Sequence, residues 1–253
     1  MPLDLLIVPC LVHNYAYLLH DPASGDTALI DAPDDDVIAA TLTKKGWTLT
    51  DIALTHHHWD HIDGLEKLRG QARVTGGADD AERLPRLDRA VREGDSFVLC
   101  GTPVQVFDVP GHTLGHIAFY LPGESLLFSA DSLMTMGCGR LFEGDPAMMW
   151  ASLQKLRALP ADTRVMTGHE YGQTNIDFAL SLGEDNPALA RRAADVKAAR
   201  DQGLPTTGAT LATEAATNPF LRADAPALAA AIGMEGADPV AVFTEIRKRR
   251  DNW

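Results

Sequence analysis

Long apolar runs, paired cysteines and an excess of basic residues are all missing from this 253-residue chain. No apolar run approaches the ~18–20 residues of a membrane-spanning helix, so we expect no membrane partner. The three cysteines, Cys10, Cys100 and Cys138, are odd in number and far apart, which argues against a disulfide framework and against a CxxC metal site. A reducing, cytoplasmic setting is therefore expected.

Basic residues number 22 against 35 acidic ones, and the formal net charge is −13. Because nucleic-acid affinity depends on neutralising phosphates, we expect no nucleic-acid partner. The N-terminal segment has no basic region and carries Asp4, so it is expected to form a first strand and not a signal peptide. Hydrophobic residues make up 45 % and charged residues 23 %, values typical of a soluble globular protein, which we expect to be a monomer.

The chain has two parts that differ in composition. Residues 1–172 contain short apolar segments bounded by Gly, Pro and Asp, a pattern typical of strands. Residues 173–253 are rich in alanine, and most of the expected helices there open with proline. We predict an α/β domain over 1–172 and an all-helical domain over 173–253. The expected strands are 4–8, 14–19, 27–31, 52–54, 73–75, 97–99, 102–108, 117–120, 126–129 and 164–166, and the expected helices are 35–45, 64–68, 147–159, 175–182, 187–202, 226–232 and 239–250.

Four metal-ligand side chains follow the apolar segment at 52–54 within a few residues. In extended backbone alternate side chains share a face, so His56 and His58 can point at the same ion. A turn at Asp60 and His61 would carry that pair to a neighbouring point. Four polar side chains after a buried strand need strong compensation, which favours metal binding. The segment is predicted to hold two cations side by side.

Three further candidates also follow expected strands. His112 lies after the strand at 102–108, Asp131 after the strand at 126–129 and His169 after the strand at 164–166. Polar side chains at strand ends beside glycine or a small residue project from the sheet edge, where functional residues gather. Imidazole and carboxylate ligands suit zinc first, with iron or manganese as alternatives.

Several motifs together resemble the metallo-β-lactamase superfamily and, within it, the hydroxyacylglutathione hydrolases (glyoxalase II). The superfamily motifs are Thr-His-His-His-Trp-Asp-His-Ile-Asp-Gly at 55–64 and Pro-Gly-His-Thr-Leu-Gly-His at 110–116. The narrower resemblance is carried by Gly-Cys-Gly-Arg at 137–140, Gly-His-Glu-Tyr at 168–171, Asn-Pro-Phe at 218–220 and the basic C-terminal helix. It implies an αββα sandwich followed by a glutathione-binding helical domain.

The resemblance also implies the roles of individual residues. One metal ion would be held by His56, His58 and His112, and a second by Asp60, His61 and His169, with Asp131 bridging the two. Asp60 and Asp131 would also orient the attacking hydroxide. The residues implied in glutathione binding are Arg140, Tyr171, Arg247 and Arg250.

Periodicity in the last expected helix selects the same two arginines. Val240, Phe243, Arg247 and Arg250 fall on one stripe, so both arginines are expected to face inward if the two apolar residues face the protein body. Inward guanidiniums need anionic partners, and glutathione offers two carboxylates. The alternative is a solvated basic helix end favoured by the helix dipole.

The expected reaction is hydrolysis of S-(2-hydroxyacyl)glutathione, chiefly S-D-lactoylglutathione, by a hydroxide that bridges the two cations. A thiolate leaves with a pKa near ~8.5, so no strong general acid is required. His57 is expected to point away from the ligands, and His116 is expected to make hydrogen bonds, either structural ones or ones that support a metal ligand, and not to bind a metal ion. Cys138 is assigned no catalytic part.

Other reactions on the same fold remain open. A glutathione persulfide dioxygenase is expected to use fewer ligands on one iron, and a lactonase would not need an arginine-lined helical domain. A dinuclear β-lactamase is disfavoured because that class commonly places a cysteine where this chain has Asp131. Three positions also depart from the family pattern: Phe142 replaces a tyrosine found in some relatives, Asp145 a common threonine and Ala130 a frequent glycine.

Overall fold

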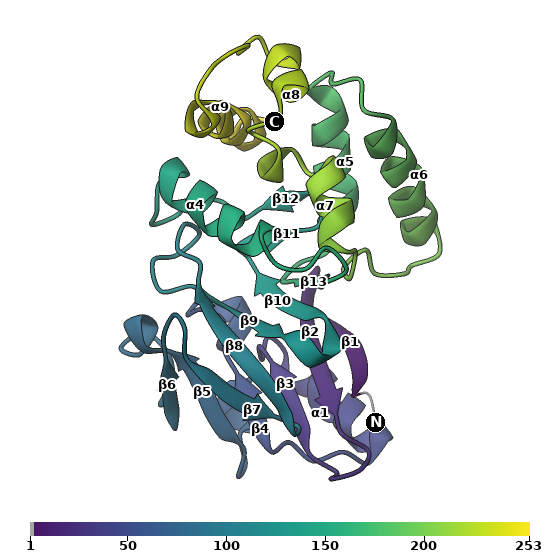
Figure 1. Ribbon diagram of the computed structural model, residues 1–253. Helices are drawn as coiled ribbons and strands as arrows, with labels where there is room; N and C mark the ends of the chain where they lie inside the picture. The colour runs from purple at the N-terminus through teal and green to yellow at the C-terminus, as the bar shows by residue number, and fades with distance from the viewer. Residues whose placement is uncertain (1–2) are drawn as a thin grey trace. The chain divides into compact units, whose positions relative to one another are not determined.

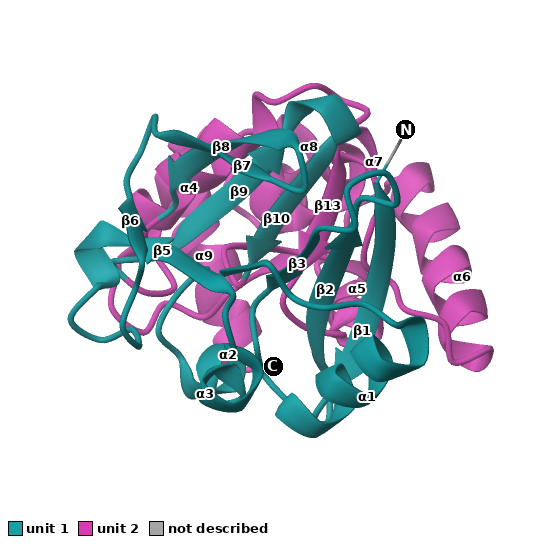
Figure 2. Cartoon of the chain, turned by 90° about the horizontal axis from the view of Figure 1, so that it is seen from below, with its two compact units in different colours: residues 1–109, 114–130 teal, residues 110–113, 131–253 magenta. Residues whose placement is uncertain are grey.

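The computed structural model describes residues 3–253, so the first two residues of the predicted α/β domain lie outside the described residues. The chain forms two compact units, coloured separately in Figure 2. Unit 1 contains the described residues up to Val109 together with Leu114–Ala130, and unit 2 contains Pro110–Thr113 and Asp131–Trp253. The predicted domain boundary at residues 172 and 173 therefore falls inside unit 2.

Unit 1 begins with a mixed sheet in which the strands follow one another in chain order (Figure 1). The first three strands are antiparallel and the last three add in parallel. Helical crossovers join the parallel strands, as parallel pairing requires. The strands are β1 (Asp4–Cys10), β2 (Asn14–His20), β3 (Thr27–Ile30), β4 (Asp51–Ala53), β5 (Arg73–Gly77) and β6 (Arg89–Val91).

The helices of unit 1 are α1 (Asp35–Lys45), α2 (Trp59–Ile62) and α3 (Leu65–Leu68). Helix α1 starts where the side chain of Asp34 accepts a hydrogen bond from Val37 N, and ends at Gly46 with φ 70°. Ile38 of α1 and Leu65 of α3 are fully buried in one core with the apolar side chains of β3, β4 and β5. This core holds the end of β4, and thus the start of the histidine segment, in place.

A second, antiparallel sheet of unit 1 contains β7 (Ser96–Leu99), β8 (Thr102–Asp108), β9 (Ile117–Leu121) and β10 (Leu126–Ala130), in the order β10-β9-β8-β7. Tyr17 of β2 meets Phe128 of β10 edge to face, with ring centroids 5.3 Å apart, so the two sheets pack through their inner faces. All side chains of β9 and β10 are buried. Two short 3₁₀ turns, η1 (Ala78–Asp80) and η2 (Pro122–Glu124), complete the unit.

Unit 2 is mostly helical (Figure 1). Proline occupies the first turn of α4, α6, α8 and α9, where its missing N–H costs nothing. Its core includes the stacked rings of Phe178 and Phe220, and Phe243 of α9 packs against Trp150 of α4 at 5.9 Å. The elements are β11 (Leu133–Met134), β12 (Gly137–Cys138), α4 (Pro146–Arg157), β13 (Arg164–Thr167), α5 (Gly172–Ser181), α6 (Pro187–Asp201), α7 (Leu211–Thr217), η3 (Pro219–Leu221), α8 (Pro226–Ala231) and α9 (Pro239–Asp251).

The predicted strands and helices are all present, with ends that differ by a few residues. Sequence patterns missed α2, α7, β6 and the β11–β12 hairpin. The face of α9 was predicted in part wrongly: Val240 is only half-buried, whereas Val242 and Ile246 are fully buried. Across residues 3–253, the structure contains no helix with the length and apolar character of a membrane span.

Candidate metal centre

The histidine segment of unit 1 directly follows β4 and is organised by one buried carboxylate, Asp31. Its Oδ1 accepts a hydrogen bond from Thr55 N at 2.9 Å, and its Oδ2 accepts one from Thr55 Oγ1 at 2.8 Å. The same Oδ2 lies 2.9 Å from His61 Nδ1. Asp31 adopts φ 55°, a conformation that aspartate tolerates better than most residues.

Asp31 also determines which ring nitrogen carries the proton in His61 and in His56. A carboxylate can only accept, so His61 Nδ1 donates to it and Nε2 keeps the lone pair. Thr55 gives its hydroxyl proton to Asp31, so its oxygen accepts from His56 Nδ1 at 3.0 Å. His56 is thereby left with its lone pair on Nε2 as well. This is how metal-ligating histidines are commonly oriented.

The other ligand candidates of this segment lie close by. Asn14 Nδ2 donates to both the main-chain oxygen and Oδ2 of Asp60, at 2.9 and 3.0 Å. The ring of His56 lies 4.8 Å from that of His58 and 4.3 Å from that of His61. His56 and His61 are fully buried. So many imidazoles in one small volume need a cation or a proton to compensate their burial.

Unit 2 contributes His112, Asp131 and His169. His112 Nδ1 lies 2.7 Å from the main-chain oxygen of Arg140, which can only accept, so Nε2 again keeps the lone pair. Asp131 Oδ2 lies 3.1 Å from His169 Nε2 and 3.4 Å from His112 Nε2. The ring of His169 is stacked on that of Tyr171, with centroids 5.0 Å apart. One carboxylate oxygen thus lies beside two imidazoles.

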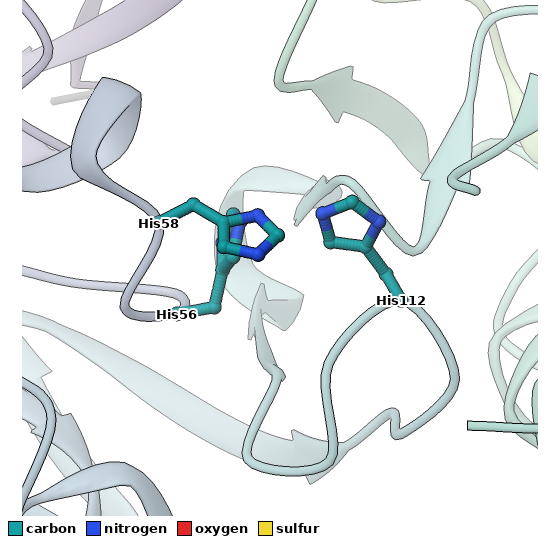
Figure 3. A group of neighbouring side chains, drawn as sticks. All are labelled: His56, His58 and His112. Carbon is teal, nitrogen blue, oxygen red and sulfur yellow. The ribbon is translucent and has the colours of Figure 1, made fainter. Parts of the chain in front are cut away.

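Three groups of these side chains have ligand atoms within 4.8 Å of one another. Imidazole nitrogens and carboxylate oxygens at such spacing are of the kind that hold divalent metal ions. Figure 3 shows the group formed by three histidines. The groups are His56, His58 and His112; His56, His61 and Asp131; and Asp60, His61 and His169.

The residues expected to play no direct part are accounted for by other contacts. His57 Nδ1 lies 3.0 Å from Asp80 Oδ2, and His116 stacks on His56 at 4.5 Å. Cys138 is buried, and burial raises the pKa of its thiol to about 11, so it is protonated at neutral pH. A protonated thiol is a poor nucleophile, which agrees with giving Cys138 no catalytic part.

The arginines expected to face inward do so. Arg247 is buried and Arg250 is half-buried, while Lys248 and Arg249 are exposed. Arg247 Nη1 donates to the main-chain oxygen of Cys138 at 3.2 Å, and Arg250 Nη2 donates to Asn175 Oδ1 at 3.3 Å. The side chain of Arg140 is 59 % exposed.

The positions that depart from the family pattern have clear structural settings. Phe142 is 61 % exposed and meets the ring of His112 edge-on at 5.3 Å. Asp145 caps α4 by accepting a hydrogen bond from Met148 N at 2.8 Å. Ala130, directly before Asp131, adopts φ 41°, a left-handed conformation that explains why glycine is favoured there.

Sequence reasoning missed three residues that hold the histidine segment in place. Asp31 orients His56 and His61, Asn14 holds Asp60, and Asp80 accepts from His57. Asp31 and Asp80 could have been found, because each is a carboxylate that closely follows a strand, the signal that selected Asp131. Asn14 carries no such signal, since it lies within a strand.

Comparison with known proteins agrees with this architecture. A family model for the metallo-beta-lactamase superfamily matches residues 11–169, and one for the hydroxyacylglutathione hydrolase C-terminus matches 170–253. The chain is 56 % identical to the hydroxyacylglutathione hydrolase of Ruegeria pomeroyi over 100 % of both chains. Among solved structures, the fold is similar to that of ETHE1 from Myxococcus xanthus, with 25 % identity and a TM-score of 0.68. The match covers 98 % of this chain and 90 % of that one. TTHA1623 in a di-iron-bound form is also similar (28 % identity, TM-score 0.62, 85 % of this chain and 98 % of that one).

The fold and the His/Asp groups therefore define a metal-dependent hydrolase of the metallo-β-lactamase superfamily, with a C-terminal helical domain. Both the predicted fold class and the predicted enzyme class are confirmed. Within the superfamily, the chain belongs to the hydroxyacylglutathione hydrolase family.

Proposed function

We propose that this protein hydrolyses the thioester of S-(2-hydroxyacyl)glutathione, with S-D-lactoylglutathione as its chief substrate and D-lactate and glutathione as products. The observation that carries the proposal is the presence of two complementary ligand groups, His56, His58 and His112 on one hand and Asp60, His61 and His169 on the other. Two groups of this composition, in a chain of this family, support a hydrolytic centre with two cations.

In the proposed centre each group would hold one cation, with Asp131 as a ligand shared by the two. The donor set suits zinc and also accepts iron or manganese, and the similar protein TTHA1623 was solved with two irons. The residues fit such ions because Nδ1 of His56, His61 and His112 is engaged by an oxygen, which directs Nε2 to the metal. When bound, such cations would supply a water of lowered pKa, toward ~7, and positive charge for the thioester oxygen.

The remaining roles belong to side chains of the protein. Asp60 and Asp131 accept hydrogen bonds from the attacking water and orient it toward the thioester carbon. The leaving thiolate of glutathione has a pKa near ~8.5, so it departs without a general acid. Cys138 stays protonated, with a pKa of about 11, and does not compete as a nucleophile.

Glutathione recognition is proposed for Arg140, Tyr171, Arg247 and Arg250. Glutathione carries two carboxylates, and guanidinium groups bind carboxylates through paired, charge-assisted hydrogen bonds. Support comes from the inward position of Arg247 and Arg250 on α9, in the segment matched by the C-terminal family model. We also propose that the helical domain begins at residue 173 and that the enzyme is a cytoplasmic monomer that binds no nucleic acid. The free thiols of all three cysteines support the location.

The test is turnover of S-D-lactoylglutathione by the purified, metal-replete protein, followed by the loss of thioester absorbance. We expect rapid hydrolysis, loss of activity after treatment with a chelator, and recovery on addition of Zn²⁺. Recovery separates metal removal from irreversible unfolding, which circular dichroism checks directly.

Absence of hydrolysis by folded, metal-replete protein would refute the proposal. Oxygen uptake with glutathione persulfide, and hydrolysis of lactones, would then be measured on the same preparation. Hydrolysis that survives complete metal removal would refute the two-cation centre while leaving the substrate assignment intact.

A further inference from the structure

One carboxylate, Asp251, lies among the arginines proposed to bind glutathione. Its Oδ1 accepts hydrogen bonds from Arg247 Nη2 and Nε, at 2.8 and 3.1 Å. The same oxygen lies 3.6 Å from Arg140 Nε. The side chain of Asp251 is 36 % exposed and that of Arg247 is 8 % exposed. Asp251 therefore occupies the Nε–Nη2 edge of Arg247, an edge through which guanidinium groups bind carboxylates.

Arg247 is held in position without any ligand. Besides Asp251, its guanidinium donates to the main-chain oxygen of Cys138 and lies over the ring of Phe220, 5.0 Å from the centroid. A buried guanidinium is stable only when its charge is matched, and Asp251 supplies the matching charge.

Arg250 has a different environment. Its guanidinium lies over the rings of Phe178 and Trp253, at 5.7 and 5.5 Å, and donates to the amide oxygen of Asn175. Burial, followed by the positive charge of Arg247, lowers its pKa, while Asp251 acts in the opposite direction. Arg250 is thus an under-compensated cation whose attraction for an anion is reduced by Asp251.

We propose that Asp251 is an affinity-determining residue: its negative charge competes with the carboxylates of glutathione for Arg247 and weakens the pull of Arg140 and Arg250. The inference rests on the proposed function of the arginines in glutathione binding. Glutathione is both part of the substrate and a product, so a site that binds it too tightly would release it slowly. Asp251 limits that affinity.

The test is Asp251→Asn, which keeps the shape and an acceptor oxygen for Arg247 but removes the charge. We expect KM for S-D-lactoylglutathione and the inhibition constant of glutathione to fall together by about three- to tenfold. Hydrolysis of a simple thioester without the peptide should not change. Raising the salt concentration should reduce the difference between variant and wild type, because the effect is electrostatic.

Glu245→Gln is a matched control on the same helix. Glu245 pairs with Arg249 at the same i, i+4 spacing as Arg247 and Asp251, but Arg249 is exposed, whereas Arg247 is buried. The control removes one negative charge from α9 and breaks one ion pair, like Asp251→Asn. Its partner Arg249 is not among the arginines proposed to bind glutathione, so KM and the inhibition constant of glutathione should not change. Equal effects of the two variants would show that only net charge matters and would overturn the inference.

Unchanged or raised KM and inhibition constants in Asp251→Asn would also overturn it, because they would make Asp251 neutral or a positioning residue for Arg247. Failure of the proposed function is recognised separately, on the wild-type protein. In that case metal-replete wild type neither hydrolyses the glutathione thioester nor binds glutathione in a calorimetric titration, and both proposals fall.

Discussion

Among single residues, Asp31 has the widest influence on the candidate metal centre. Its two oxygens receive the amide and hydroxyl protons of Thr55 and the Nδ1 proton of His61, and through Thr55 it also orients His56. The same residue thus sets the tautomers of two proposed ligands. A carboxylate is needed for this, because it accepts from every partner.

Asp31→Asn should lower the affinity for metal ions while the protein still folds. The amide has nearly the same shape, but its NH₂ would face His61 Nδ1, which must then accept and would move its proton to Nε2. A protonated Nε2 cannot bind a metal ion, so we expect metal affinity to fall by about 10–100-fold. Bound metal, measured by mass spectrometry after dialysis against a competing chelator, checks this.

Asp51→Asn is the control at this scale. Asp51 is buried at the other end of β4 and accepts from Arg73 Nε and Nη2, at 2.9 and 2.8 Å. The asparagine should lower the free energy of unfolding by about 1–2 kcal/mol and leave the metal content unchanged. Equal metal loss in both variants would contradict the tautomer argument.

The candidate ligands were accessible from sequence because each follows a strand, and strand ends are where side chains gather at a sheet edge. The contacts of these ligands with the residues that hold them in place could not be predicted from the sequence. Nothing in a single sequence pairs Asp31 with His61, or Asn14 with Asp60, because those pairs depend on which strands become neighbours. The proton positions follow only from the hydrogen-bond partners.

At the scale of elements, the β11–β12 hairpin explains the first glycine of the Gly-Cys-Gly-Arg motif. Asn175 Nδ2 donates to Thr135 O at 2.9 Å, and a Cβ at Gly137 would lie 2.6 Å from that same nitrogen. The buried carboxylate of Glu214, whose pKa is raised by burial, accepts from Met136 N at 2.9 Å. Asn218 Nδ2 donates to the main-chain oxygen of Gly137 at 3.0 Å. Side chains of α5, of α7 and of the residue that follows α7 thus hold the hairpin.

Gly139→Ala should disrupt this element and the ligands beside it. A Cβ at position 139 would lie 2.0 Å from the main-chain oxygen of Asp131 and 2.9 Å from His112 Nδ1. Backbone atoms cannot give way cheaply, so we expect about 3 kcal/mol or more of lost stability, together with reduced metal content. Urea unfolding and metal analysis measure the two effects.

Gly123→Ala provides the comparison, because the nearest atom to its added Cβ is Thr102 Cγ2 at 3.9 Å. Its stability should change by less than about 0.5 kcal/mol. A Gly139→Ala protein that is as stable and as metal-rich as Gly123→Ala would show that the hairpin can shift freely.

Elements with a strong sequence pattern were the predictable ones. The proline-initiated helices α6, α8 and α9 and the apolar strands β9 and β10 have clear boundaries. The hairpin strands β11 and β12 span two residues each, too short for any periodicity. In α9 the stripe was placed too far to one side, because Val242 and Ile246 also pack inward and widen the buried face.

At the scale of the whole molecule, the two compact units are not consecutive segments of the chain. Residues 110–113 belong to unit 2 although the segments on either side of them belong to unit 1, so His112 and His116 fall in different units. A prediction that divides the chain at one point cannot identify a short segment that belongs to the other unit. Composition was informative at this scale only for general properties, such as charge and the absence of cysteine pairing.

Stability of the whole chain should fall in alkaline solution because all three thiols are buried. Burial raises the pKa of Cys10 and Cys100 from 9.0 to about 12, and that of Cys138 to about 11. Above pH 9 the unfolded chain releases these protons while the folded protein keeps them, so the unfolded state is favoured as pH rises toward the folded pKa. Each thiol contributes a loss of about 1.4 kcal/mol per pH unit in that window.

Cys100→Ala isolates one of these contributions. Cys100 lies in the turn between β7 and β8, where its thiol contacts Leu19 O at 3.4 Å. Without that thiol, the free energy of unfolding should fall less steeply between pH 9 and pH 11, by about 1 kcal/mol per pH unit relative to wild type. Urea unfolding at intervals of half a pH unit measures the slope. Val98→Ala, at an exposed position of β7, should leave the slope unchanged whatever it does to stability. If Cys100→Ala also leaves it unchanged, the thiol of Cys100 ionises as readily in the folded protein as in the unfolded chain, and its burial does not protect its proton.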